Sequence, residues 1–346
     1  MLQLTKISLF IVVVLIAACT KPESPAEEST AGDKDLWLVP PEKVLYKDLP
    51  KDRIQSIDQP VFIPLDESDV KPDDLVLVAH IDGQTRIYPV SILDIHEIVN
   101  DNINNDYFAI TYCPLTASGM LWNREIDGEL SEFGVSGMLY NENLMPYDRN
   151  TGSIWSQMKT KCVHGSLMGN IPETKALLET KFSTIKAAFP GAFVLVHEAC
   201  DSTSCGRDLL KNDPVEGETV DLPLDQQYFG FAKNESLLLF NLELFGDGTQ
   251  VFTTNFQGTS LLVCGNKDLH FFIAFLRNNS AAGDVFSALQ NEFPLIMKDN
   301  RGNKYDIFGK VAEGPDKDAR LETATTYLAR TFAWELFYNK IEVFEE

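Results

Sequence analysis

The sequence predicts an α+β protein that is rich in β-strands and consists of two weakly similar halves with short helices. Short runs of β-branched and aromatic residues alternate with turn signals such as Asp-Gly and Asn-Thr-Gly. Helical spacing of apolar residues is confined to a few short segments. The order of segments in residues 51–200 recurs in residues 201–346, with a period of about 150 residues that is too long for a solenoid. We therefore expect that one β-rich unit was duplicated.

The first half contains the clearer local signals. A hairpin is expected over residues 75–90, because two β-rich runs flank Asp82-Gly83. Ser91 is a candidate helix cap, and apolar residues follow it at helical spacing as far as Val99. The remaining expected elements are a strand over residues 107–112, a hairpin over 119–135 that turns at Asp127-Gly128, a helix over 174–189 and a strand over 193–196.

The second half repeats this order more weakly. Residues 228–242 resemble the first hairpin, and residues 260–264 match the strand that ends at Cys113, which makes Cys264 the expected counterpart of Cys113. The segment from Leu295 matches the segment from Leu144, and the sequence FAWELF matches the helix that closes the first half. In these segments Asp148, Gly152, Trp155 and Gly165 align with Asp299, Gly302, Tyr305 and Gly314.

The amino-terminal residues have the features of a bacterial lipoprotein signal. Lys6 precedes an apolar run over residues 7–16, and two alanines precede Cys19. The apolar run is shorter than the roughly 20 residues that span a bilayer. The order Ile-Ala-Ala-Cys also matches the bacterial lipobox, so we expect residues 1–18 to be removed and Cys19 to carry acyl chains such as palmitate. The alternative is an ordinary signal peptide with a chance cysteine.

Residues 19–35 comprise the lipidated cysteine and a flexible acidic tether. The tether is rich in Pro, Glu, Ser and Thr, and therefore buries too little apolar surface to offset the entropy of ordering. We expect a protein of the bacterial cell envelope that is anchored to a membrane through Cys19 and faces the periplasm or the cell surface. Thr20 in place of Asp favours the outer membrane in a Gram-negative cell.

Charge and cysteine content exclude some functions and suggest others. The chain has 51 acidic and 29 basic side chains and a net charge of −22, which repels nucleic acid and anionic lipid surfaces. Five cysteines remain after Cys19, an odd number in an oxidising compartment. At least one thiol therefore stays free, pairs with another molecule or binds a ligand.

Several motifs resemble a known family. They are HEIVND from His96, TYCPLTASGMLWNREIDG from Thr111, FGVSGMLYNENLMPYDRNTGSIWSQ from Phe133 and the later FAWELF. The chain resembles the bacterial family named domain of unknown function 3179 from about Lys51 to its end. The resemblance implies an exported or membrane-anchored protein with a cysteine in a Cys-Pro-Leu-x-Gly-like motif. Relatives place a second cysteine or its selenium analogue at the position of Thr116, so this chain lacks a vicinal dithiol.

Cys113 is the candidate reactive group, and His96 is its candidate base or metal partner. The Thr116 hydroxyl is expected to donate a hydrogen bond to a Cys113 thiolate, with resolution by an external thiol. The competing interpretations are a buried cysteine at a strand end and a core histidine bonded to the backbone. Glu97 is expected to be solvated. Trp155 and Gln157 are expected to line a pocket together with Thr116.

Two other cysteine motifs have separate interpretations. Cys200 and Cys205 enclose a short polar loop, which favours a disulfide over a redox role. Cys162 and His164 lie two residues apart on one face of an extended segment, and sulfur with imidazole suits copper or zinc. They are only weak metal candidates, and no metal is assigned.

The sequence supports two functional hypotheses from different classes. The first is an envelope lipoprotein that handles thiols or a thiol-ligated metal at Cys113, with an envelope thiol or protein as its partner. The alternative is a non-catalytic binding or assembly module. Enzymatic activity stays open and no cofactor is identified, because the chain has no phosphate loop, dinucleotide fingerprint or nucleophile elbow.

Overall fold

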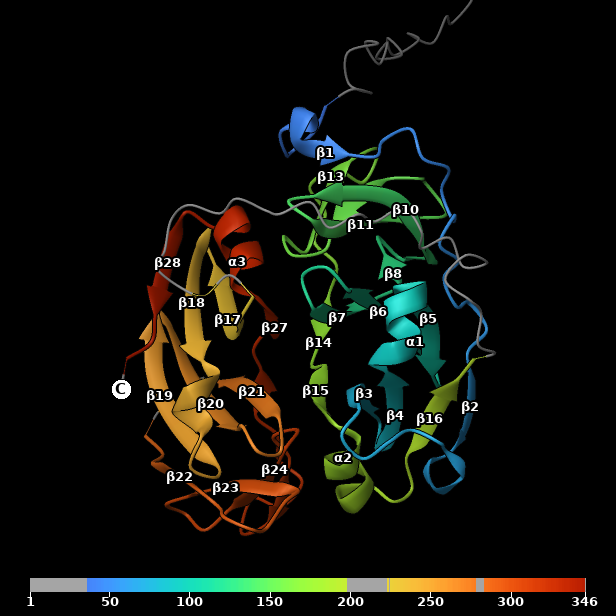
Figure 1. Ribbon diagram of the computed structural model, residues 1–346. Coiled ribbons are helices and arrows are strands. Elements are labelled where there is room, and N and C mark those ends of the chain that lie inside the picture. Colours follow the sequence, from blue (N-terminus) through green and yellow to red (C-terminus); the bar gives the residue numbers. More distant parts are fainter. Residues whose placement is uncertain (1–35, 198–222, 224, 278–282, 346) are drawn as a thin grey trace, which may run out of the picture. The chain divides into compact units, whose positions relative to one another are not determined.

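A computed structural model describes residues 36–197, 223, 225–277 and 283–345 (Figure 1). The chain divides into two compact units, residues 1–36 and 37–346, and every element below belongs to the second unit. The expected signal peptide, Cys19, the expected tether and the expected Cys200–Cys205 disulfide lie outside the described residues. Within the described part of the chain, no helix is both long enough and apolar enough to cross a membrane.

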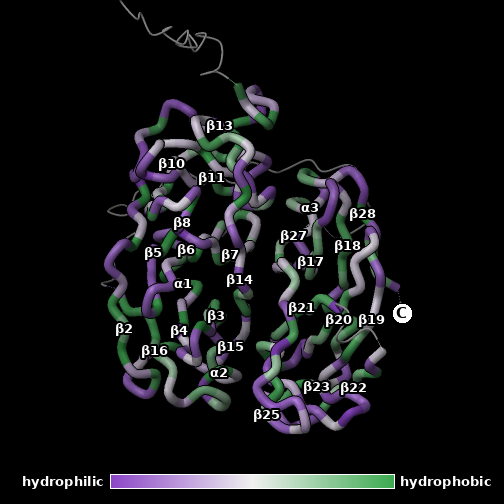
Figure 2. The backbone as a smooth tube through the Cα atoms, turned by 180° about the vertical axis from the view of Figure 1, so that it is seen from behind, coloured by the Kyte–Doolittle hydropathy of each residue, from purple (hydrophilic) through white to green (hydrophobic). Residues whose placement is uncertain are grey.

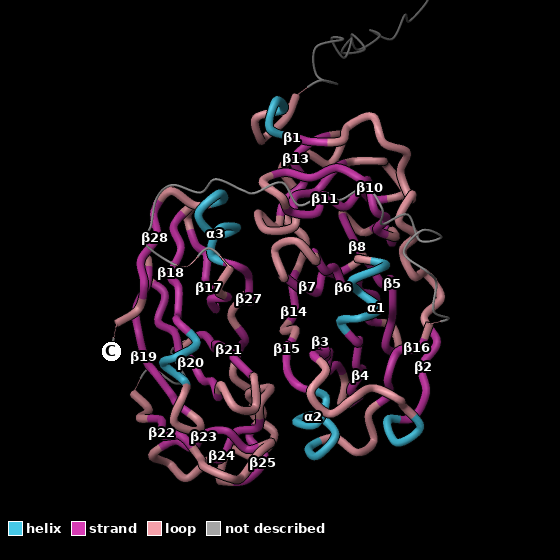
Figure 3. Tube along the Cα trace, viewed as in Figure 1, coloured by secondary structure: helices cyan, strands magenta, loops and turns pink. Residues whose placement is uncertain are grey.

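The expected fold class is confirmed. The described residues form seven β-sheets, together with three α-helices of seven residues each. Strands and loops make up most of the chain, and the helical segments are short (Figure 3). The helices are α1 (Val90–His96), α2 (Phe182–Ala188) and α3 (Thr331–Phe337). The core lies between the sheets, and β18 is apolar along most of its length (Figure 2).

Three larger sheets and one small hairpin come from the first half. The first sheet has the order β15 (Leu178–Lys181), β3 (Leu75–Ile81), β4 (Gln84–Pro89), β16 (Phe193–Val196) and β2 (Val61–Pro64). The second has the order β14 (Thr174–Lys175), β7 (Ser118–Asn123), β6 (Asp106–Cys113) and β5 (Ile98–Ile103). The third has the order β1 (Val44–Leu45), β10 (Phe133–Tyr140), β11 (Asn143–Asp148), β12 (Ile154–Ser156) and β13 (Lys161–His164). The small hairpin pairs β8 (Glu125–Ile126) with β9 (Glu129–Leu130).

Three further sheets come from the second half. The first has the order β27 (Thr326–Arg330), β17 (Gln227–Lys233), β18 (Ser236–Asn241) and β28 (Lys340–Val343). The second has the order β19 (Gln250–Phe256), β20 (Thr259–Asn266), β21 (Phe271–Leu276) and β26 (Glu322–Thr323). The third has the order β22 (Phe286–Ala288), β23 (Leu295–Asp299), β24 (Lys304–Asp306) and β25 (Val311–Glu313).

The strand orders of the two halves correspond. The run β27-β17-β18-β28 has the same connections as β15-β3-β4-β16, including one parallel pair at the same place. The run β26-β21-β20-β19 corresponds to β14-β7-β6-β5, and β22 to β25 correspond to β10 to β13. The correspondence lets individual positions be compared between the halves, while duplication itself stays a prediction.

The short-range turn signals are confirmed, and two longer elements differ from expectation. Asp82 and Gly83 join β3 to β4 with φ angles of 50° and 78°. The turn at Asp127-Gly128 also forms, but it joins only β8 and β9. The helix expected over residues 174–189 is wrong in its first half, because residues 178–181 pair with β3 before α2 begins. Pairing with a sheet outweighs a weak helical pattern.

The helix expected after Ser91 is shorter than its pattern. α1 begins at Val90, after Pro89, and has no side-chain cap. It ends at His96 because Glu97 adopts a φ of 59°, and Val99 already lies in β5. This abrupt change from helix to strand brings Glu97 next to the end of β6, where Tyr112 donates its N–H to the Glu97 carbonyl at 2.7 Å.

Candidate functional site

Cys113 is the last residue of β6, and the Cys-Pro-Leu-Thr motif forms the turn that follows it. Residues 114–117 make the turn, and Cys113 pairs with Ser118 at the start of β7. Pro114 has no N–H to extend the ladder, and Ala117 adopts a φ of 48° to redirect the chain. The sulfur therefore lies where regular strand pairing stops, as the sequence predicts.

Two neighbouring residues lower the pKa of the Cys113 thiol. They are Thr116 in the turn itself, through its side chain and backbone, and Leu144 in β11, through its backbone. The thiol in turn donates to the carbonyl oxygen of Glu142 at 3.6 Å. Asn141 and Glu142 form the turn between β10 and β11, with φ angles of 50° and 60°. The sulfur thus has donors suited to a thiolate and an acceptor suited to a thiol.

Burial and a nearby carboxylate favour the protonated thiol. The side chain of Cys113 is only 2% exposed. Burial raises the pKa of Cys113, and the negative charge of Glu97 raises that pKa further, while the donors from Thr116 and Leu144 act in the opposite direction. Glu97 is itself buried, so the expectation that it is solvated is wrong. The left-handed backbone at the end of α1 directs it inward.

A fully buried polar network lies beside Cys113. Gln157 Oε1 accepts hydrogen bonds from Ser118 at 3.0 Å and from Asn143 at 2.7 Å. Gln157 Nε2 donates to Thr111 Oγ1 at 3.1 Å and to the Ser118 carbonyl at 3.2 Å. Asn143 Nδ2 also reaches Thr116 Oγ1 at 3.0 Å, and that hydroxyl lies 2.8 Å from Ser118 Oγ. Because Ser118 donates its one hydroxyl hydrogen to Gln157, the Thr116 hydroxyl donates to Ser118, so the network holds the hydrogen of this hydroxyl.

The structure thus unites part of the predicted site and adds residues that sequence reasoning missed. Thr116 and Gln157 share one hydrogen-bonded network beside Cys113, while the pocket suggested by the sequence at Thr116, Trp155 and Gln157 stays a prediction. Ser118 and Asn143 were missed, because single small polar residues at strand ends give no sequence signal. They are at most 1% exposed. Buried polar groups of this kind are retained only when they are hydrogen-bonded, and here they are.

The side chain of His96 contacts Gln55 and His197. Its Nδ1 lies 2.8 Å from the Gln55 carbonyl oxygen, and its ring packs against His197 at a centroid distance of 4.4 Å. Burial lowers the pKa of His96, so the ring is favoured in its neutral form. The carboxylate that acts on Cys113 belongs to the next residue, Glu97. A role for His96 as the base of Cys113 stays a prediction.

Trp155 belongs to the core beside the network. Its Nε1 donates to Asp148 Oδ2 at 3.1 Å, and its ring packs edge-on against Phe133 at 5.7 Å. Asp148 Oδ1 accepts the N–H of Thr151 at 2.8 Å, which makes an Asp-capped turn. The Trp155 side chain is fully buried and supports the β11–β12 hairpin.

Cys162 and His164 point to different surroundings. The Cys162 sulfur lies 3.5 Å from the carbonyl oxygens of Ile154 and His164, and burial raises its pKa to about 12. The His164 ring stacks on Trp37 at 4.2 Å. A register shift between β12 and β13 separates the two side chains. In the described part of the chain, no three His, Cys, Asp or Glu side chains are grouped to hold a metal ion.

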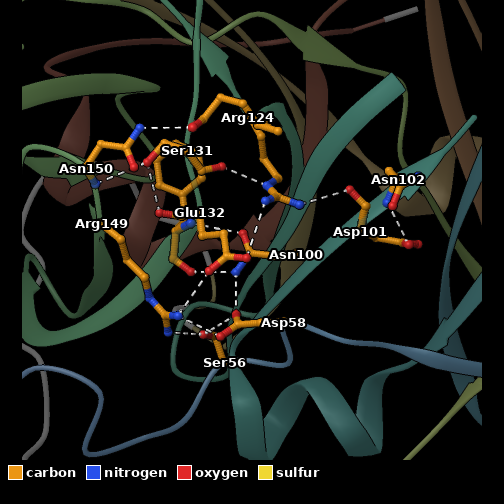
Figure 4. Close-up of polar contacts among 12 residues, drawn as sticks. Ser56, Asp58, Asn100, Asp101, Asn102, Arg124, Ser131, Glu132, Arg149 and Asn150 are labelled. Carbon is orange, nitrogen blue, oxygen red and sulfur yellow. Dashed lines mark hydrogen bonds and ion pairs between the residues drawn. The ribbon is translucent and has the colours of Figure 1, made fainter. Parts of the chain in front are cut away.

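A charged cluster fastens the segment that precedes the first sheet. Arg149 pairs with Asp58 at 2.7 Å, and Asn100 Nδ2 donates to the same aspartate at 2.7 Å (Figure 4). Arg124 Nε donates to the Ser131 carbonyl at 2.8 Å (Figure 4). These side chains come from β5, the β7–β8 junction and the turn after β11. They have mutual partners, which fits a structural role.

Strand pairing also corrects the expected counterpart of Cys113. Cys264 pairs with Ile273 inside the β20–β21 ladder, two residues before β20 ends at Asn266. Asn266 therefore occupies the position of Cys113, and Cys264 occupies that of Thr111. Burial raises the pKa of Cys264. A hydrogen bond with the backbone of Gly265 acts in the opposite direction.

Comparison with known proteins gives one result. Among curated proteins and among solved structures, no significant match to this chain was found. The model of a family described as a protein of unknown function, DUF3179, matches residues 51–341, a range that includes the Cys113 turn and the buried polar network. Because this match covers most of the sequence, the chain belongs to the DUF3179 family.

Proposed function

We propose that this chain is a lipid-anchored protein of the bacterial cell envelope in which Cys113 performs thiol–disulfide exchange with an envelope thiol or protein. The observation that carries the proposal is the position of the Cys113 sulfur at the end of the β6–β7 ladder, where Thr116 and Leu144 lower its pKa against the effect of burial. Donors aimed at a sulfur stabilise the thiolate, which is the nucleophilic form. The lipobox before Cys19 supports the assignment to the envelope.

The exchange needs only one protein thiol. The Cys113 thiolate attacks one sulfur of a partner disulfide, whose S–S bond breaks as the second sulfur leaves as a thiolate. The product is a mixed disulfide between Cys113 and the partner. Thr116 cannot resolve it, so an external thiolate attacks the partner sulfur and releases the Cys113 thiolate again. No net oxidant is consumed.

Access to the sulfur requires movement of the Asn141–Glu142 turn. Glu142 accepts the hydrogen bond from the thiol, and Asn141 Nδ2 donates to the Leu336 carbonyl oxygen at 2.6 Å, which fastens the turn to α3. The Thr116 backbone N–H belongs to the Cys113 turn and stays with the sulfur when the other turn moves. Opening therefore removes part of the burial penalty while keeping this favourable contact, which favours the thiolate.

The burial of Cys113 favours the second candidate function, a non-catalytic binding or assembly module, and one experiment separates the two. Full-length protein in detergent is treated with iodoacetamide, and labelling of Cys113 and Cys264 is followed by mass spectrometry. We expect Cys113 to be alkylated faster than Cys264 in the folded protein. Asn141→Gly, which loosens the turn, should accelerate labelling of Cys113 alone.

Asn104→Gly serves as the control, because Asn104 lies in the turn at the opposite end of β6 and also has a positive φ, 54°. If Cys113 is labelled no faster than Cys264, or only on unfolding, Cys113 is a packing residue. The binding-module interpretation then replaces thiol exchange.

A further inference from the structure

A cavity of about 310 Å³ lies between the segment after β12 and the β17–β18 turn. Its lining from the first half includes residues 158–161 and Ile171, and its lining from the second half includes residues 232–235, Tyr327 and Tyr338. A volume of roughly 300 Å³ is at the lower end of the range for small-molecule sites. Cys113 is not among the residues that line the cavity, so binding there does not depend on thiol reactivity.

The charges around the cavity are unlike those of the chain. Three lysines line it, Lys159, Lys161 and Lys233, whereas its one acidic residue is Glu235. The chain as a whole has a net charge of −22. Charges separated by more than about 8 Å are largely screened at physiological ionic strength, so the lysines of the cavity outweigh remote carboxylates. The local potential therefore favours an anion.

The single acidic residue neutralises this charge poorly. Glu235 pairs with Lys159 at 3.3 Å, but its side chain is 83% exposed. An ion pair with one partner so exposed contributes little and is readily exchanged for another anion. Among the described residues, Lys233 Nζ donates a hydrogen bond to a neutral group, the Thr259 hydroxyl. The lysines are thus available to an incoming negative group.

The apolar wall of the cavity is held rigidly. The hydroxyls of Tyr327 and Tyr338 both donate to the Met158 carbonyl oxygen, at 3.0 and 3.2 Å. The Met158 N–H donates to Asn143 Oδ1 at 3.1 Å, so the peptide that begins the lysine-containing segment is fixed from both sides. A rigid wall reduces the entropy lost on binding.

Both tyrosines are only 7% exposed, and the Tyr327 ring stacks on Trp334 at 4.5 Å, so they offer the cavity ring edges and not open faces. Ile171, which is 70% exposed, supplies further apolar surface.

We propose that this cavity binds a small organic anion that combines a carboxylate or phosphate group with an apolar portion. The anionic group lies among the three lysines, and the apolar portion packs against Ile171 and the exposed edges of Tyr327 and Tyr338. The two parts of such a ligand match the two kinds of lining residue. A purely inorganic anion uses only the lysines, and a neutral aromatic molecule uses only the wall.

The test measures binding to full-length protein in a neutral detergent by isothermal titration calorimetry. The probes are benzoate, phenyl phosphate, inorganic phosphate and the neutral control benzyl alcohol. We expect saturable binding of benzoate or phenyl phosphate at one site, weaker binding of inorganic phosphate and none of benzyl alcohol. Which of the two organic probes binds more tightly distinguishes a carboxylate ligand from a phosphate ester.

Lysine variants place the binding in this cavity. The double variant Lys159→Gln with Lys161→Gln should weaken binding about tenfold or more, since the loss of even one charge-assisted hydrogen bond, about 1.5 kcal/mol, is roughly tenfold. Lys298→Gln is the matched control, because Lys298 is exposed on β23, away from the cavity lining. Equal affinity in the double variant and the control, equal binding of benzyl alcohol, or no binding of any anion would each overturn the proposal.

Discussion

The turn after Cys113 and the turn after Asn266 have the same length and a similar backbone conformation. They differ in the side-chain atom that accepts a hydrogen bond from the turn. Each turn is four residues long, and its last residue, Ala117 or His270, has a φ of 48° or 51°. Asn266 Oδ1 accepts the N–H of Leu269 at 2.9 Å, as the Cys113 sulfur accepts the N–H of Thr116. An amide oxygen therefore suffices to close this turn. The geometry alone does not explain a thiol at position 113.

The surroundings of the two turns differ more than the turns themselves. The first half buries the polar side chains of Thr111, Thr116, Ser118, Asn143 and Gln157. Strand order and register place Cys264, Leu269, Phe271, Pro294 and Ile307 at the corresponding positions. These counterparts lack the buried hydroxyls and amides, although the strand order is the same. The fold therefore tolerates an apolar core at this place, and the polar network is a specific property of the Cys113 side.

The largest expected effect comes from making the first half resemble the second. Gln157→Leu removes the partner of Thr111, Ser118 and Asn143 and leaves buried polar groups unsatisfied. We expect the free energy of unfolding to fall by about 3 kcal/mol, because one unsatisfied buried group costs about 1–3 kcal/mol. Urea unfolding of the full-length protein measures the loss.

The matched control is Ile307→Val in the second half, which should cost only about 1 kcal/mol. If Gln157→Leu lowers the free energy of unfolding by less than about 1 kcal/mol, its effect is that of an ordinary surface substitution or a conservative core change. Such a result would contradict the view that the network is a tightly coupled unit.

An intermediate effect is expected when the two turn-closing residues are exchanged. Cys113→Asn supplies the acceptor that the second turn uses, so the protein should fold and lose only its fast alkylation. Asn266→Cys should cost about 1 kcal/mol, since sulfur is a weaker acceptor than an amide oxygen. Its new thiol should react more slowly than Cys113, because Leu269 offers no hydroxyl. Equal alkylation rates at the two positions would show that the turn alone sets reactivity.

The smallest expected effect concerns pH. The pKa of Cys113 is raised by burial and by the negative charge of Glu97, so Glu97→Gln should lower that pKa. At a fixed pH below the pKa, more thiolate is then present and alkylation of Cys113 is faster. The pH–rate profile of Cys113 should move to lower pH, while that of Cys264 stays in place. An unchanged Cys113 profile would mean that the Glu97 charge does not act on the sulfur.

The same shifts give stability a defined pH dependence. The pKa values of Cys113 and Cys264 are raised on folding, so the folded state favours the protonated thiols. Their contribution to stability is complete below the pKa of an unfolded thiol, about 8.5, and is lost as pH rises above it. Glu97→Gln should reduce the part of this loss that Cys113 contributes.

The sequence by itself determined the local features of this protein. Asp82-Gly83 dictates a tight hairpin turn, Pro114 ends a strand, and alternating apolar residues produce the β-rich fold. These signals are local because φ preferences and side-chain alternation act within a few residues. The family resemblance also located Cys113 and Thr116, and the position after the Gly152 turn singled out Gln157, which shares a hydrogen-bonded network with Thr116.

Only the tertiary structure decided which polar groups surround the sulfur. It also decided which of the segments with helical spacing form helices. Ser118, Asn143 and Gln157 come from different strand ends, and their contacts depend on how two sheets meet. Glu97 faces the core because α1 stops abruptly before β5, and residues 178–181 form a strand because β3 offers them an edge. Such outcomes depend on partners far away in the sequence, since a buried polar or strand-edge group must find its hydrogen bonds wherever the fold supplies them.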